Sequence, residues 1–236
     1  SSRGLQVSLI LAVVAICTIA FYRKTSHSEW QSCFLRAAHH MRLGEPIHQP
    51  HVETYSYPPA MAWFAVPFSA LPYQWSLHGW YLVNLICTFV TVIYGWRLAG
   101  GPERSRMNRS WLLVGALAAL LSLRFIIEPL LNHQFDMLIT ALLFYGCWRV
   151  ATGREITGSI LVGLAAAMKC TPLLMIPYFL WRRQLRPAFL VAAVALGANL
   201  LPDLFYPQEL GSHYFADWCT TYLSYLGSHA PGQWFS

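Results

Sequence analysis

The chain has 236 residues, of which 56% are hydrophobic and only 11% are charged. Soluble domains carry about a quarter charged residues, so this composition excludes an ordinary soluble protein and indicates a polytopic membrane protein. The formal net charge is +6, but no basic stripe with interleaved aromatic residues occurs, which excludes nucleic-acid binding.

Long apolar runs predict an all-α fold, a polytopic membrane helix bundle with about seven or eight membrane segments. Several runs are shorter than the ~20 residues of a perpendicular helix, which is tolerated where protein or a water-filled cavity shields the backbone. We expect a single membrane domain, residues 1–236, that forms the N-terminal part of a longer protein, since no methionine precedes Ser1 and no closing helix follows. The apolar runs are residues 5–22, 58–73, 77–98, 110–127, 136–150, 156–168, 172–181 and 187–202.

The distribution of arginine predicts the orientation of these segments. Loop 23–57 and the C-terminal stretch 203–236 are expected on the extracytoplasmic side, the latter as an interfacial loop with aromatic anchors. Two crossings cannot join this outer loop to the first inner one, so either run 58–73 is re-entrant or one arginine cluster breaks the rule. The clusters that the positive-inside rule assigns to the cytoplasm lie at residues 97–109, 149–154 and 182–186.

Loop 23–57 contains apolar residues at helical spacing. They fall at i, i+3, i+4, i+7, i+8 and i+11, and Gly44 follows as a helix terminator. This pattern predicts an amphipathic helix that lies flat on the membrane surface. Its apolar face is Trp30, Cys33, Phe34, Ala37, Ala38 and Met41.

A second stripe of this helix carries Glu29, Arg36 and His40, at i, i+7 and i+11. A guanidinium matches phosphate oxygens bidentately, and a carboxylate can accept the proton of an attacking hydroxyl. This stripe would lie where a lipid-linked phosphate arrives. The structural alternative is equally simple: 26-SHSE-29 fits a capping box, in which Glu29 only secures a helix start, and His40 is solvated at the interface.

Four further segments carry polar residues at the predicted membrane boundaries. Pro58-Pro59 forces Tyr57 into an extended backbone. Lys169 ends an apolar run and either snorkels to the interface or lines a pocket. Gln134 and Asp136 either cap a helix or line a pocket, and Arg124 and Glu128 are spaced to pair across one turn.

Several of these motifs together resemble glycosyltransferase family 87, polyprenol-phosphate-dependent membrane enzymes of the GT-C fold type. The likeness covers roughly residues 5–200. It departs from the family pattern where Glu29 replaces an aspartate, His133 a glycine and Asp136 an asparagine. The motifs are Glu29-Trp30, Phe34, Ala37-Ala38, Gly44-Glu45-Pro46, Tyr57-Pro58-Pro59 through Leu71-Pro72, 132-NHQFDMLITALLF-144 and 163-GLAAAMKCTPLLMIPYFLWRR-183.

The resemblance implies transfer of a hexose or arabinofuranose, with inversion, from a polyprenyl-phosphate donor to a glycan or glycolipid acceptor. It places the reaction on the extracytoplasmic face of the membrane. We therefore expect a multi-pass protein of the bacterial plasma membrane. Glu29 would be the base. Substrate would be bound by Arg36, His40, Tyr57, His133, Gln134, Asp136 and Lys169, with Arg36, His40 and Lys169 next to the leaving phosphate.

The resemblance implies no cofactor beyond the lipid-linked sugar, assigns no metal ligand and leaves the requirement for a metal ion open. Two other interpretations remain open. The chain could be a membrane transporter or lipid-binding protein, although no paired halves with broken helices are found. It could also be a catalytically inactive relative, because Glu29 departs from the family pattern.

Overall fold

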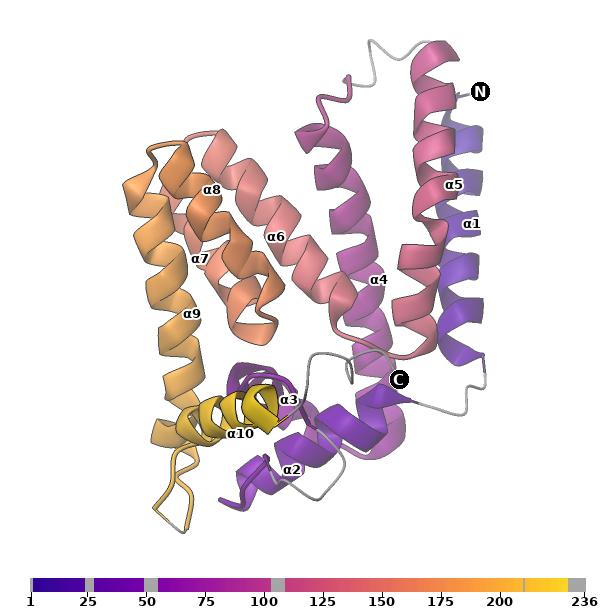
Figure 1. Ribbon diagram of the computed structural model, residues 1–236. Coiled ribbons are helices and arrows are strands. Elements are labelled where there is room, and N and C mark those ends of the chain that lie inside the picture. The colour runs from indigo at the N-terminus through magenta and orange to yellow at the C-terminus, as the bar shows by residue number, and fades with distance from the viewer. Residues whose placement is uncertain (1, 24–27, 49–54, 103–108, 210, 229–236) are drawn as a thin grey trace. The chain divides into compact units, whose positions relative to one another are not determined.

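The computed structural model describes residues 2–23, 28–48, 55–102, 109–209 and 211–228, and within these ranges every regular element is a helix (Figure 1). The predicted all-α fold is therefore confirmed. The chain divides into two compact units. Unit 1 comprises Ser1–Trp30 and Gln74–Val162, and unit 2 comprises Gln31–Tyr73 and Gly163–Ser236.

Unit 1 is built from long apolar helices and the first half of α7. Helix α1 packs against α5, and α5 packs against α6. Aromatic rings join α4 to α6. The ring centroid of Tyr94 lies 4.6 Å from that of Tyr145 and 5.0 Å from that of Trp148. The helices are α1 Ser2–Tyr22, α4 Tyr73–Leu98, α5 Arg109–Leu131, α6 Asp136–Ala151 and α7 Glu155–Met168.

Two glycines let α6 and α7 approach closely. A Cβ atom at Gly146 would lie 2.9 Å from the carbonyl oxygen of Gly158, and a Cβ at Gly158 would lie 2.6 Å from the carbonyl oxygen of Gly146. Small residues at helix contacts are the usual way in which membrane helices gain packing, because lipid supplies no hydrophobic drive.

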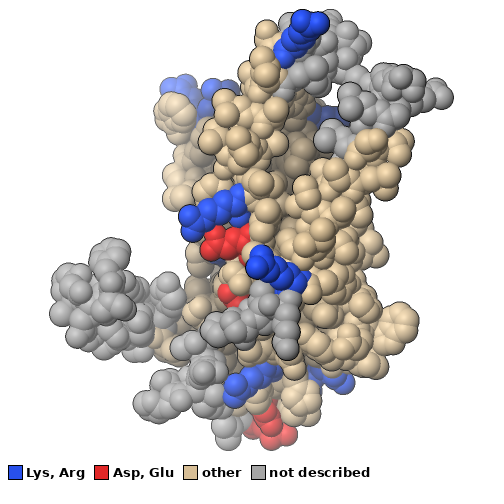
Figure 2. Space-filling view, turned by 90° about the vertical axis from the view of Figure 1, so that its right-hand side faces the viewer, with Lys and Arg blue, Asp and Glu red and all other residues tan. Residues whose placement is uncertain are grey.

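The surface of unit 1 suits a lipid environment. Helix α5 is long and apolar enough to cross a membrane, and no residue of its most apolar 18-residue stretch is buried. On the face shown in Figure 2, charged side chains are confined to a few places and most of the described surface is uncharged. The exposed apolar side chains of α5 include Leu113, Val114, Leu117, Leu120, Leu121 and Phe125.

Three helices of the described ranges meet the length and hydropathy of a membrane span: α4, α5 and α9. They support the predicted membrane location, whereas the total of seven or eight segments stays a prediction. The predicted pair on α5 is confirmed, since Arg124 Nε lies 3.3 Å from Glu128 Oε2.

Unit 2 contains the amphipathic helix and the C-terminal part of the chain, Gly163–Ser236. Helix α3 packs against both α2 and α9, and α9 also contacts α8 and α10. Its elements are a π-helical turn Trp30–Leu35, α2 Arg36–Arg42, α3 Pro59–Ser69, a 3-10 turn Thr171–Leu174, α8 Met175–Trp181, α9 Leu185–Phe205 and α10 Tyr214–Ser228.

The predicted amphipathic helix is confirmed in its extent and in five of the six residues of its apolar face, whereas the sixth, Cys33, is partly exposed. Trp30, Phe34, Ala37, Ala38 and Met41 are all buried, at 0–4% exposure. Its first turn, however, is π-helical, with i→i+5 hydrogen bonds. The α-helical spacing that put Glu29 on one stripe with Arg36 and His40 therefore does not hold across this turn. The capping box depends on Ser26, which lies outside the described residues.

Two expectations about the membrane segments change. Helix α3 has 11 residues and rises about 17 Å, roughly half the hydrocarbon thickness, so it cannot cross alone. Its length favours the re-entrant alternative for run 58–73. The expected loop at 203–236 is wrong for most of its described length, because α9 extends to Phe205 and α10 occupies Tyr214–Ser228.

Candidate functional site

Glu29 is held from two directions within unit 1. Its backbone N–H donates to the carbonyl oxygen of Asn132 at 3.1 Å. Its side chain, which is half-buried, accepts a hydrogen bond at Oε1 from Gln134 Nε2 at 2.5 Å. Two residues predicted from motifs 105 positions apart are thus in direct contact. An amide donor fixes the plane of the carboxylate and leaves its acceptor character intact.

The next residue, Trp30, anchors this segment. Its indole ring stacks on Trp80 with centroids 4.4 Å apart and planes 2° from parallel. Trp30 Nε1 donates to Ser76 Oγ at 3.1 Å, and Trp80 Nε1 donates to the carbonyl oxygen of His133 at 3.1 Å. Both indoles are fully buried with their N–H groups satisfied. The backbone that carries Glu29 is therefore fixed on its C-terminal side.

His133 ties three chain segments together. Its backbone has φ 56°, in the left-handed region. The ring contacts the carbonyl oxygen of Phe21 through Nε2 at 2.8 Å and Ser28 Oγ through Nδ1 at 2.7 Å. A carbonyl can only accept, so Nε2 carries the proton, and in the neutral ring the Ser28 hydroxyl donates to Nδ1. Burial lowers the pKa of His133, which favours this neutral form.

Asp136 is the first residue of α6 and is half-exposed. The residue before it, Phe135, supplies no side-chain cap. A carboxylate in the first turn interacts favourably with the positive end of the helix dipole. Asp136 is therefore inside the helix and not at its cap position, and it lies two residues after Gln134.

In unit 2, the predicted cations of the amphipathic helix differ in their surroundings. Arg36 is exposed at the start of α2. His40 is half-exposed and its Nδ1 lies 2.5 Å from Glu45 Oε2. Gly44 lies between them with φ 70°, and a Cβ there would come within 2.9 Å of the carbonyl oxygen of Pro207. Glycine at this motif position is therefore required twice, by conformation and by space.

The backbone around Tyr57 is bound by side chains from outside the segment. The carbonyl oxygen of Ser56 accepts from Trp218 Nε1, and that of Tyr57 accepts from His48 Nε2, each at 3.0 Å. The Tyr57 ring lies 5.3 Å from that of Phe34. The stiff entry predicted from Pro58-Pro59 is thus reinforced by hydrogen bonds.

Sequence reasoning missed Asn199, a buried residue that contacts the segments carrying two of the predicted site residues. It lies in α9 at 5% exposure. Its Oδ1 accepts from the Ala60 N–H at 3.1 Å, and its Nδ2 donates to the carbonyl oxygen of Ala167 at 3.2 Å. Ala167 lies two residues before Lys169, which is half-exposed just beyond α7. The available signal was an amide inside the apolar run 187–202, where a polar group is costly unless bonded.

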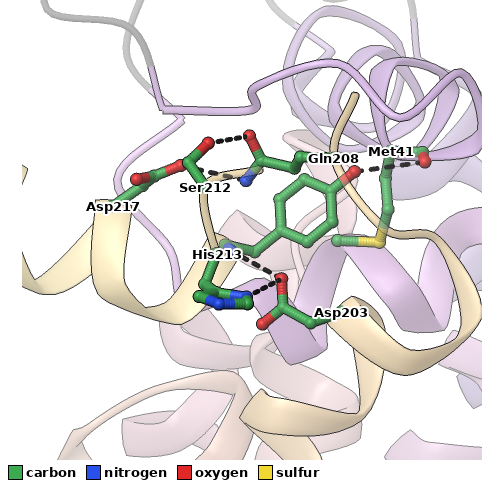
Figure 3. A network of polar contacts seen from close by, with 7 residues as sticks. Met41, Asp203, Gln208, Ser212, His213 and Asp217 are labelled. Atoms are coloured by element: carbon green, nitrogen blue, oxygen red, sulfur yellow. Dashed lines mark hydrogen bonds and ion pairs between the residues drawn. The ribbon is translucent and has the colours of Figure 1, made fainter. Parts of the chain in front are cut away.

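The end of α9 and the start of α10 bind the amphipathic helix through one tyrosine (Figure 3). Tyr214 donates from its hydroxyl to the carbonyl oxygen of Met41 at 3.3 Å and from its N–H to Asp203 Oδ1 at 2.8 Å. Burial raises the pKa of Tyr214 to about 12, and the carboxylates of Asp203, Asp217 and Glu45 add to the shift. Gln208 Nε2 donates to Asp217 at 2.9 Å.

The eight predicted site residues are thus divided between the units. Unit 1 holds Glu29, His133, Gln134 and Asp136, of which Glu29 and Gln134 are in contact. Unit 2 holds Arg36, His40, Tyr57 and Lys169, and Asn199 joins the segments that carry Tyr57 and Lys169. Within the described ranges, no three His, Cys, Asp or Glu side chains are placed to hold a metal ion.

Comparison with known proteins gives two matches. Residues 55–235 match the model of glycosyltransferase family 87. The chain is also 26% identical, over 166 residues, to a Mycobacterium tuberculosis (strain CDC 1551 / Oshkosh) protein named polyprenol-phosphate-mannose-dependent alpha-(1-2)-phosphatidylinositol pentamannoside mannosyltransferase. That alignment covers 69% of this chain and 36% of the relative, so the chain spans about a third of the relative's length.

No solved structure matches the chain. The family match covers well over half of the chain and includes both the Tyr57-Pro58-Pro59 and the Lys169 segments. The all-helical architecture agrees with the GT-C fold type that the resemblance implied. The chain therefore belongs to glycosyltransferase family 87.

Proposed function

We propose that the protein is a membrane glycosyltransferase that takes a sugar from a polyprenyl-phosphate donor and transfers it, with inversion, to an extracytoplasmic glycan or lipid. The sugar is a hexose such as mannose, or arabinofuranose. Membership of family 87 and the name of the mycobacterial relative support this reaction class. The observation that carries the proposal is the hydrogen bond from Gln134 to Glu29. It orients a half-buried carboxylate and joins two of the motifs on which the resemblance rests.

In the proposed step the acceptor hydroxyl attacks the anomeric carbon and Glu29 takes its proton. The bond from the anomeric carbon to the phosphate oxygen breaks, and the polyprenyl phosphate leaves with the bonding electrons. Gln134 donates to Oε1 of Glu29 and so fixes the plane of the carboxylate. The other oxygen of Glu29 can then accept the proton of the acceptor hydroxyl. Both ring nitrogens of His133 already have partners, so we assign His133 to holding this segment.

The leaving phosphate monoester gains negative charge as the bond breaks. Cationic side chains lower the barrier when they are placed beforehand near that charge. Arg36, His40 and Lys169 are the proposed cations, and the contact of His40 with Glu45 fixes its ring. Tyr57 and Asp136 are proposed to contact the sugar or the acceptor.

The test compares Glu29→Gln with wild type in lipid vesicles supplied with polyprenyl-phosphate mannose or polyprenyl-phosphate arabinose. Glutamine keeps the shape but cannot take the proton, so we expect kcat to fall by about 10²–10⁴-fold. Release of polyprenyl phosphate is the readout.

The matched control is Glu128→Gln, an exposed glutamate of the same unit that pairs with Arg124 and should leave kcat unchanged. Transfer by Glu29→Gln at the wild-type rate would remove Glu29 as the base. Failure of wild type to release polyprenyl phosphate from either donor would overturn the reaction class itself.

A further inference from the structure

The start of α3 has an unusual requirement for a hydrogen-bond partner. The cap position is Pro58, whose side chain cannot accept, and Pro59 at the first helical position has no N–H. The Ala60 N–H is the first donor that needs a partner from outside the helix. Asn199 Oδ1 accepts from it at 3.1 Å, so a side chain of α9 replaces the missing cap.

The same amide satisfies the opposite end of another helix. Asn199 Nδ2 donates to the carbonyl oxygen of Ala167, in the last turn of α7, at 3.2 Å, and to Ala195 in its own helix at 2.9 Å. The last carbonyls of a helix have no partner within it. One buried carboxamide, at 5% exposure, thus caps the N-terminus of α3 and the C-terminus of α7 together.

Small side chains make this double contact possible. Ala60, Ala167 and Ala198 form one buried cluster around the amide. Nearby on α7, a Cβ at Gly163 would lie only 2.6 Å from Val194 of α9. Close backbones without intervening large side chains restrict how far the helices can slide. The geometry around Asn199 is therefore closely defined.

The two capped helix ends lead directly into the two motifs of unit 2. Tyr57 lies three residues before Ala60, and Lys169 lies two residues after Ala167. We propose that Asn199 is a positioning residue that fixes the Tyr57 segment against the Lys169 segment, so that both can engage the phosphate end of the lipid-linked donor. This inference rests on the proposed function.

A second buried asparagine shows that this arrangement is specific to Asn199. Asn84 of α4 is 1% exposed and donates only to the carbonyl oxygen of Trp80, one turn back in its own helix, at 3.0 Å. Its Oδ1 has no hydrogen-bond partner. Asn84 therefore joins no second helix within the described structure and provides a matched control for substitution.

The experiment compares wild type, Asn199→Leu and Asn84→Leu in lipid vesicles, with kcat and donor KM measured for polyprenyl-phosphate mannose per folded protein. Leucine keeps the branched shape and the number of side-chain heavy atoms, although it is bulkier, and it removes all three hydrogen bonds. Because misplacement by about 1 Å can cost about 10²-fold, we expect kcat/KM of Asn199→Leu to fall at least about tenfold, with a raised donor KM. Asn84→Leu should stay within about twofold of wild type.

Asn199→Asp supplies a readout that a merely structural role would not move. A protonated aspartic acid can accept from Ala60 and donate to Ala167, whereas the ionised form only accepts. Its kcat/KM relative to wild type should therefore rise as pH falls, while the ratio of Asn199→Leu to wild type stays constant. A ratio for Asn199→Asp that stays as low as that of Asn199→Leu at every pH would overturn the proposal.

Hydrogen exchange at the Ala60 amide tests the bridge without any turnover. We expect Asn199→Leu to speed this exchange and Asn84→Leu to leave it unchanged, and an unchanged rate in Asn199→Leu would overturn the bridge. Faster exchange with wild-type kcat/KM would overturn the positioning role alone. Absence of transfer by wild type would instead count against the proposed function.

Discussion

His133 occupies the left-handed region of backbone space, with φ 56°, at the motif position where the family resemblance implied glycine. A left-handed residue with a Cβ costs roughly 1–2 kcal/mol. The two ring hydrogen bonds and contact with the Phe21 ring, 4.3 Å away, offset this cost. Glycine would remove the strain but also the bonds that secure Ser28, the residue before Glu29.

The buried imidazole predicts a dependence of stability on pH. The pKa of His133 is lowered by burial, so below about pH 6.5 the unfolded chain binds a proton that the folded protein resists. This contribution to stability is complete above pH ~6.5 and is lost as pH falls through the lowered pKa. We expect the melting temperature to drop more for wild type than for His133→Asn between about pH 7.5 and pH 5.5.

The control for this measurement is His78→Asn. His78 is exposed and contacts only the Tyr22 hydroxyl and ring among the described residues. Burial also lowers the pKa of His48, but His48 is common to all three proteins and cancels in the comparison. Equal pH dependence in wild type and His133→Asn would show that His133 does not carry the effect.

At single residues, sequence reasoning found the groups that share a motif and missed those that act through space. Glu29 and Gln134 were predicted from their motifs, and their contact at 2.5 Å became visible only in the fold. Asn199 lies in no recognised motif. Its importance depends on which two helix ends meet it, and no spacing in one sequence encodes that.

At the scale of elements, close packing of α6 on α7 depends on Gly146 and Gly158. A side chain at Gly158 would meet backbone atoms, since its Cβ would lie 2.6 Å from the Gly146 carbonyl oxygen and 2.7 Å from the Val150 nitrogen. Backbone cannot move aside as a flexible side chain can. The two helices would have to separate, with loss of the contacts on which membrane helices depend.

Gly158→Val should therefore destabilise the protein by about 1–3 kcal/mol, the usual cost of overpacking. Gly197→Val is the matched control, because Gly197 is also helical but a Cβ there meets nothing within 4 Å. Thermal unfolding in detergent gives the comparison. Similar melting temperatures for the two variants would contradict the close contact.

Helix boundaries followed the apolar runs to within a few residues where the run was long, as in α4, α5 and α9. Two local features escaped this pattern. The π-helical turn Trp30–Leu35 still buries Trp30 and Phe34, so the apolar pattern does not reveal it. Helix α10 contains too many polar residues to stand out as an apolar run, and its aromatic residues were interpreted as interfacial anchors.

At the scale of the whole molecule, composition alone indicated a membrane protein, because charged residues are few along the entire chain. In the structure, the same low polarity is seen on the surface of α5, where apolar side chains are exposed. The division into two units did not follow from the sequence, because each unit combines segments that are distant along the chain.

The membrane environment of α5 can be tested with one charge. Leu120 is 68% exposed near the middle of the helix, so Leu120→Arg should raise the apparent insertion free energy by about 2.5–3.5 kcal/mol. Leu113→Arg, nearer the helix start at 72% exposure, should cost less because arginine can snorkel. A glycosylation-mapping insertion assay measures both. Equal insertion of Leu120→Arg and wild type would show that α5 does not lie in the hydrocarbon core of the membrane.

The parallel indoles of Trp30 and Trp80 have a practical consequence. Two identical chromophores stacked at 4.4 Å couple their strong electronic transitions, which gives a paired band in far-ultraviolet circular dichroism. Because one partner directly follows Glu29 in the chain, the amplitude of that band reports the conformation of the segment without any label. Donor titration in vesicles could then be followed optically while the sugar is being transferred.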